Sequence, residues 1–106
     1  MPTTQEVELL PAFAAELERA LRADGKDELA DQVAGLVIES LCGCGDDFCS
    51  SFYTGVRPVG AWGPALRNVT PAVATGMVIL DVVDDRIRYV EVLDRGDVKA
   101  VLEAVR

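Results

Sequence analysis

The sequence predicts a single α+β domain covering residues 1–106, with helices at both ends of the chain and a four-stranded, mainly antiparallel sheet of two hairpins between them. Apolar residues recur at three- and four-residue steps in residues 11–23, which is the spacing of a helix. They dominate residues 77–93 around a short polar turn, which is typical of paired strands. A length of 106 residues suits one hydrophobic core.

The first helix is expected over residues 11–23, with residues 4–10 as an irregular lead-in because proline at position 11 disfavours a helical residue before it. Asp24-Gly25 should end this helix, since glycine readily adopts the left-handed conformation found there. A second, short helix is expected over residues 27–34.

Residues 36–42 are predicted to form a strand. The apolar spacing also allows a continued helix, but Gly35 and the adjacent β-branched pair Val37-Ile38 favour the strand. A partner strand over residues 48–54 would complete the first hairpin around a loop at residues 43–47.

Residues 55–74 are rich in proline and glycine and have little periodicity, so they are predicted to form a long loop. The second hairpin joins residues 77–83 to 86–93 through a two-residue turn. Pairing Val83 with Arg86 beside the turn sets the register, and this register places Asp81 opposite Arg88. Asp94 is then expected to cap a closing helix over residues 95–105.

The net charge is −8 and the chain contains no histidine. Nucleic-acid binding is disfavoured, because a negative protein repels phosphate backbones. Without imidazole, catalysis through Ser-His or Cys-His pairs is excluded, as is histidine ligation of a metal. No apolar stretch is long enough to cross a membrane, and the first residues lack a secretion signal, so a cytoplasmic protein is expected.

Three cysteines fall within eight residues, at Cys42, Cys44 and Cys49. One interpretation is a thiolate metal site, with zinc as a candidate and with Asp46, Asp47 or a second subunit supplying the fourth ligand. A second is a redox switch that forms a disulfide between Cys49 and one of the other two cysteines. In the third, the cysteines pack as small hydrophobic residues and the glycines and aspartates only form the turn.

The long loop supplies candidate binding residues. Trp62 lies among glycines and prolines, and it is either an anchor for a partner or a plug that holds the loop on the core. Arg67 and Tyr53, together with Arg57 and Asn68, form an anion or carboxylate clamp if the loop brings them together.

These observations favour a small, acidic, non-enzymatic interaction or binding module. In this hypothesis the loop at residues 55–74 and the cysteine hairpin form the recognition surface for a protein or small ligand. The thiolate metal site is the alternative function, and the redox switch is the third.

The run C-x-C-G-D-D-F-C-x-x-F-Y-T, at residues 42–54, resembles a motif in small uncharacterised bacterial proteins. The similarity continues through Gly60-Ala61-Trp62-Gly63, Arg67-Asn68 and the end of the second hairpin. This resemblance implies a grouping with those bacterial proteins, and it implies no activity, ligand or catalytic residue.

Overall fold

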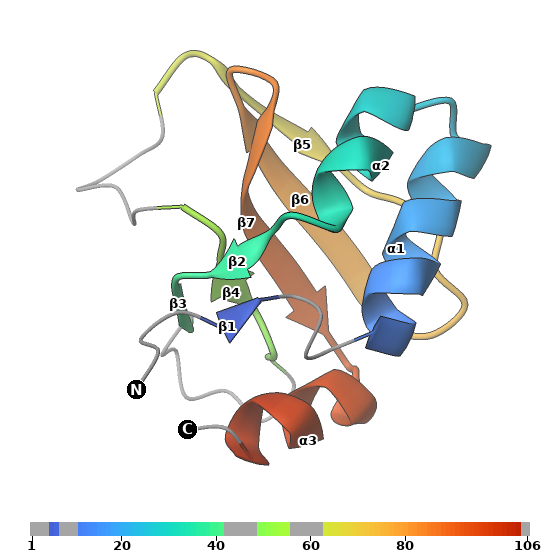
Figure 1. Ribbon diagram of the computed structural model, residues 1–106, viewed down its shortest axis with the longest axis vertical. Helices are drawn as coiled ribbons and strands as arrows, with labels where there is room; N and C mark the ends of the chain where they lie inside the picture. Colours follow the sequence, from blue (N-terminus) through green and yellow to red (C-terminus); the bar gives the residue numbers. More distant parts are fainter. Residues whose placement is uncertain (1–4, 7–10, 42–48, 56–62, 105–106) are drawn as a thin grey trace.

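The computed structural model describes residues 5–6, 11–41, 49–55 and 63–104, and it has the α+β architecture that the sequence predicts (Figure 1). No helix in these ranges is long and apolar enough to cross a membrane. In chain order the elements are β1 (Gln5–Glu6), α1 (Pro11–Ala23), α2 (Asp27–Val33), β2 (Val37–Ile38), β3 (Ser40–Leu41), β4 (Phe52–Tyr53), β5 (Leu66–Val69), β6 (Met77–Val83), β7 (Arg86–Leu93) and α3 (Gly96–Ala104).

The main sheet has five antiparallel strands in the order β3-β4-β7-β6-β5, where four were expected. The additional strand, β5, lies within the segment predicted to be a loop. Its four residues contain one buried side chain, Val69, so the alternation is too short to indicate a strand. Pairing with β6 creates it, from Leu66 opposite Val83 to Val69 opposite Leu80.

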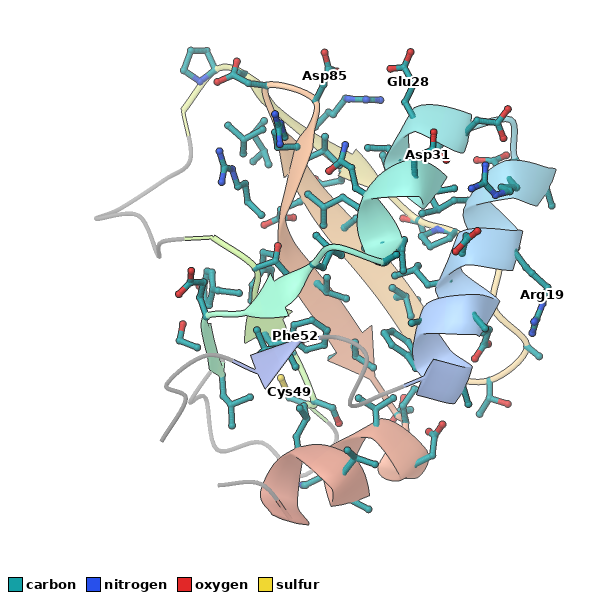
Figure 2. The ribbon with its side chains drawn as sticks, viewed as in Figure 1. Arg19, Glu28, Asp31, Cys49, Phe52 and Asp85 are labelled. Atoms are coloured by element: carbon teal, nitrogen blue, oxygen red, sulfur yellow. The ribbon has the colours of Figure 1, made fainter. Side chains whose placement is uncertain are left out.

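Both amino-terminal helices pack on the same side of this sheet, in front of it in Figure 1. α1 spans the predicted residues and is followed by Gly25, whose φ of 75° is left-handed as expected. Phe52 points from β4 into the core, whereas Arg19 and Glu28 point outward (Figure 2). The helical and sheet side chains that share this core include Phe13, Leu17, Leu21, Leu29, Val33, Val78, Leu80, Val82, Val90 and Val92.

α2 is tied to the second hairpin by the side-chain amide of Gln32. Its Nε2 donates to the carbonyl oxygen of Asp85 at 2.7 Å, and its Oε1 accepts from the backbone nitrogen of Ile87 at 2.9 Å. Asp84 and Asp85 have φ values of 52° and 63°, as a type I′ turn requires, so the predicted two-residue turn is confirmed.

The register of β6 and β7 differs from the expected one beyond the turn. A bulge places Arg88 as an extra residue, so Asp81 lies opposite Tyr89 and the predicted pair of Asp81 with Arg88 is wrong. Arg88 and Tyr89 consecutively avoid the core side, while Ile87 and Val90 on either side of them are buried. The shift brings Val90 opposite Leu80, which aligns buried residues across the two strands.

The first predicted hairpin is confirmed in the described residues. β3 pairs with β4, with Ser40 opposite Tyr53, and the strand interpretation of residues 36–42 is therefore right in place of a helix. β4 is shorter than expected, and Cys49 forms an isolated bridge with Leu93. The predicted irregular lead-in contains β1, which pairs with β2.

α3 begins at Gly96, and the predicted Asp94 cap is wrong. The first helical hydrogen bond runs from the Lys99 nitrogen to the carbonyl oxygen of Arg95, which puts Arg95 at the N-cap position. Asp94 instead adopts a left-handed φ of 57° in the turn that leaves β7.

The side chain of Arg95 is 6% exposed and joins α3 to α1. Its Nη2 lies 2.8 Å from Glu16 and 2.9 Å from Asp97, and its Cζ lies 5.4 Å from the centre of the Phe13 ring. The hydrogen bond with Asp97, together with that to Glu16, raises the pKa of Arg95, and the bond from Arg95 lowers the pKa of Asp97. The guanidinium is therefore charged at any physiological pH.

Replacing Arg95 by leucine is expected to lower the free energy of unfolding by about 2–4 kcal/mol, because Glu16 and Asp97 lose their shared cation. Urea unfolding at neutral pH measures the change. Arg19→Leu, on the exposed side of α1, is the matched control and should shift stability by less than about 0.5 kcal/mol. Equal losses in the two variants would contradict a structural role for the buried guanidinium.

Gly76→Ala is expected to destabilise the protein more than Gly25→Ala. Both glycines have left-handed φ values, 69° and 75°, so both substitutions carry the same backbone penalty, about 1 kcal/mol. A Cβ at Gly76 would also collide with the carbonyl oxygen of Leu93 and the Arg95 side chain, whereas a Cβ at Gly25 meets nothing within 4 Å. Thermal melts of the two variants make the comparison, and indistinguishable melting temperatures would refute the predicted collision.

Candidate functional site

The side of the five-stranded sheet opposite α1 and α2 is covered by no described helix or strand (Figure 1). We call this side the uncovered face. The strand registers place in one row across it Asn68 of β5, Asp81 of β6, Tyr89 of β7 and Tyr53 of β4. The row faces away from the helices because each of these positions has a neighbour in its own strand that is buried in the core: Val69, Leu80 and Val82, Val90, and Phe52.

An aromatic pair occupies the middle of the uncovered face. The rings of Tyr53 and Tyr89 have centroids 4.3 Å apart and are tilted by 44°. Beside them, Nδ2 of Asn68 donates to a carboxylate oxygen of Asp81 at 2.7 Å. These contacts fix four side chains in one row, so the centre of the face has a defined shape before any partner arrives.

Apolar side chains surround this row. Leu66 and Met77 are 37% and 48% exposed, and they are the exposed large hydrophobic residues of the described chain. Ile79 and Val83, both half-buried, lie on the same side of β6 as Met77, and Val83 is opposite Leu66. Apolar atoms at solvent-accessible positions next to an aromatic pair are characteristic of contact surfaces.

The charged residues of the uncovered face balance one another. Arg86 and Arg88 lie near the hairpin turn, and Asp81 and Glu91 lie farther along the strands. Arg88 is held against Gly55, where a Cβ would come within 2.9 Å of its Cδ. This face is therefore close to neutral, in contrast to the acidic chain as a whole.

The predicted binding residues do not gather at one place. Tyr53 lies on the uncovered face, but Arg67 lies on the other side of the sheet, because its partner in β6 is the buried Val82. Asn68, next to Arg67 in β5, again faces the uncovered side, so a clamp that combines Arg67 with Asn68 and Tyr53 does not form. Trp62 and Arg57 lie outside the described residues.

Of the predicted thiolate site, the structure describes one residue. Cys49 is half-buried and its thiol donates to Oγ of Ser51 at 3.2 Å. Cys42, Cys44 and Asp46 lie outside the described residues, and no three His, Cys, Asp or Glu side chains within those residues are grouped to hold a metal ion. The metal, disulfide and packing interpretations all remain predictions.

The cysteine segment ends near one end of the sheet, and the long loop begins near the other. Cys49, the last residue of the cysteine segment, pairs with Leu93 beside α3. Thr54 bonds to the backbone of Arg88 near the hairpin turn, where the long segment begins. The six residue steps from Cys49 to Gly55 span about 20 Å if extended.

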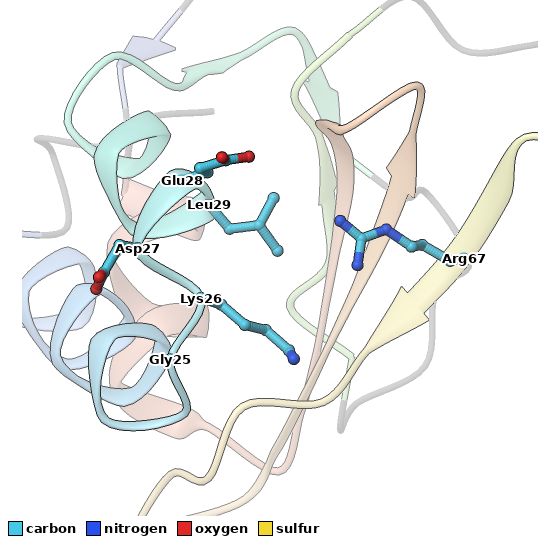
Figure 3. Close-up of a pocket in the computed structure, with 6 residues that line it drawn as sticks. All are labelled: Gly25, Lys26, Asp27, Glu28, Leu29 and Arg67. Carbon is cyan, nitrogen blue, oxygen red and sulfur yellow. The ribbon is translucent and has the colours of Figure 1, made fainter.

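Arg67 lines a cavity on the helix side of the sheet, between β5 and the turn that joins α1 to α2 (Figure 3). Lys26 enters the same cavity from the turn, and Leu29 lies between them. Sequence reasoning did not identify Lys26, because no local pattern connects it with Arg67 forty-one residues later. It also missed Tyr89, although two consecutive non-core residues between Ile87 and Val90 are a signature of a bulge.

Comparisons with known proteins find no matching family model, no matching curated protein and no matching solved structure. The function of this chain therefore has to be argued from its own residues.

Proposed function

We propose that this protein is a small non-enzymatic binding module and that its recognition surface is the uncovered face of the sheet. One observation carries the proposal: the helices cover one side of the sheet, and the other side presents the Tyr53–Tyr89 pair among exposed apolar residues. The loop at residues 55–74 and the cysteine segment are proposed to contribute to the same surface.

The composition of the uncovered face suits a protein partner. Tyrosine, methionine and arginine are enriched at protein interfaces, and all three are present there. A tyrosine has few rotatable bonds, so the tyrosine pair loses little conformational entropy when a partner covers it. The opposing charges around it can set the orientation of the partner.

Other partner classes fit this surface less well. Nucleic acids and anionic membranes are attracted by clustered positive charge, whereas this face is close to neutral on a chain of net charge −8. A folded protein whose interface has an apolar centre and a rim of mixed charge can bind this face without an excess of positive charge. We therefore propose that the partner is a protein other than a second copy of this chain.

The chemistry of the described residues also favours binding over catalysis. The chain has no histidine, and a catalytic acid or base is usually marked by a shifted pKa in a cleft. Among the described groups, the shifted pKa values of Arg22, Arg95 and Asp97 are each explained by hydrogen bonds to neighbouring opposite charges.

A photo-crosslinking residue at Ile79 tests the proposal in the native host. It is expected to form a discrete adduct with one other protein, since Ile79 lies within the uncovered face. The same crosslinker at Ala15, on the exposed side of α1, is the control and should form none. With the identified protein purified, Tyr89→Ala should weaken its binding about tenfold or more while the variant stays folded.

Equal adducts from positions 79 and 15 would refute the uncovered face as the recognition surface. An adduct with a second copy of the chain alone would also refute it, because the face would then be a dimer interface.

The thiolate metal site remains the alternative function that we propose. What favours it is the half-buried, solvent-reachable position of Cys49, since a purely structural cysteine is usually fully buried. Metal analysis of protein purified without chelator should then find stoichiometric zinc, and Cys49→Ser should lose it. Sub-stoichiometric zinc, copper and iron in freshly reduced protein would end this alternative.

A count of free thiols before and after mild oxidation of the same sample tests the redox switch.

A further inference from the structure

The cavity between β5 and the α1–α2 turn brings two cations together. It has a volume of about 310 Å³, and its lining includes Lys26, Arg67 and Leu29. Figure 3 shows Lys26 and Arg67 extending into it from opposite walls, with the Leu29 side chain between them. Two cations that extend into one hollow can contact the same anionic group from two sides.

Neither cation is strongly engaged by the protein. Lys26 Nζ lies 3.4 Å from Asp24, and Arg67 Nη2 lies 3.3 Å from Asp85. Both pairs are long and exposed, and such pairs contribute little. Arg22, by contrast, is held by Asp31 at 2.8 Å and Glu18 at 3.1 Å. Lys26 and Arg67 can therefore exchange their present partners for a ligand at small cost.

We infer that this cavity binds the carboxylate of a small organic acid. The guanidinium of Arg67 and the ammonium of Lys26 each donate a charge-assisted hydrogen bond to the carboxylate. The short hydrocarbon part of the acid covers Leu29. The cavity volume lies at the lower limit for ligand pockets, so the acid has few carbon atoms.

The acidic surroundings select for a single negative charge. Asp27 and Glu28 also line the cavity, with Glu28 next to Leu29 in Figure 3 and Asp27 turned away toward Arg22, from which it lies 3.7 Å. A doubly charged phosphate would be repelled by these carboxylates and by the net charge of −8. A monocarboxylate, with one negative charge, meets less of this repulsion.

This site is independent of the proposed recognition surface. Arg67 lies on the helix side of the sheet, whereas Tyr53 and Tyr89 lie on the uncovered face. Loss of one function leaves the other intact, so the two proposals can fail separately.

Titration of the ¹⁵N-labelled protein with sodium isobutyrate tests the inference. We expect saturable shifts of the amide resonances of residues 26–29 and 67, with a dissociation constant on the order of millimolar for so small a ligand. Isobutyramide, which has the same shape without the charge, should cause none. Inorganic phosphate at the same ionic strength should bind more weakly.

Two variants locate the site. Arg67→Gln and Lys26→Gln should each weaken isobutyrate binding about tenfold, because each removes one charge-assisted contact. Arg19→Gln, an exposed arginine on α1, is the matched control and should bind as the parent does. Both lining residues are surface-accessible, with side chains 35% and 51% exposed, so the variants are expected to fold, as a thermal melt verifies.

Absence of saturable shifts would overturn the inference, as would equal affinities in the two variants and the control. Phosphate binding as tight as isobutyrate would overturn the selectivity for a monocarboxylate and leave only a general anion site.

Discussion

The bulge at Arg88 is the constraint on which both sides of the sheet depend. Without the extra residue, Tyr89 would face the helices and Val90 would face solvent. Burying an aliphatic side chain such as Val90 stabilises the fold by roughly 1.5–3 kcal/mol, and Val92 beyond it would be misplaced as well. The same shift sets Asp81 and Tyr89 side by side on the opposite face. One inserted residue thus completes the core and builds the centre of the proposed recognition surface.

The buried guanidinium of Arg95 connects this sheet to the ends of the chain. It lies at the start of α3 and pairs with Glu16 of α1. Its side chain fits against Gly76 because glycine has no Cβ at that position. Its charge is therefore satisfied by segments that are far apart in sequence. This contact joins α3 to α1, in addition to the apolar core that the helices share with the sheet.

Local patterns predicted the parts of the fold that local interactions determine. The period of α1, its end at Gly25 and the turn at Asp84-Asp85 depend on neighbouring residues, and all three are confirmed. β5 was missed because only pairing with β6 makes its four residues a strand. The convergence of Lys26 with Arg67 was likewise beyond sequence reasoning, since tertiary packing brings them together. Tyr53 was predicted as a binding residue, but its contact with the Tyr89 ring could not be predicted without the bulge.

The position of β5 as the last strand of the described sheet has a consequence for behaviour at high concentration. An outer strand offers backbone groups to which a strand of another molecule can add, and such addition propagates into fibrils. Here the strand is four residues long, and Pro64 and Pro71 stand close to its two ends, where they supply no backbone donor. The chain should therefore resist amyloid-like growth from this edge, however crowded its surroundings.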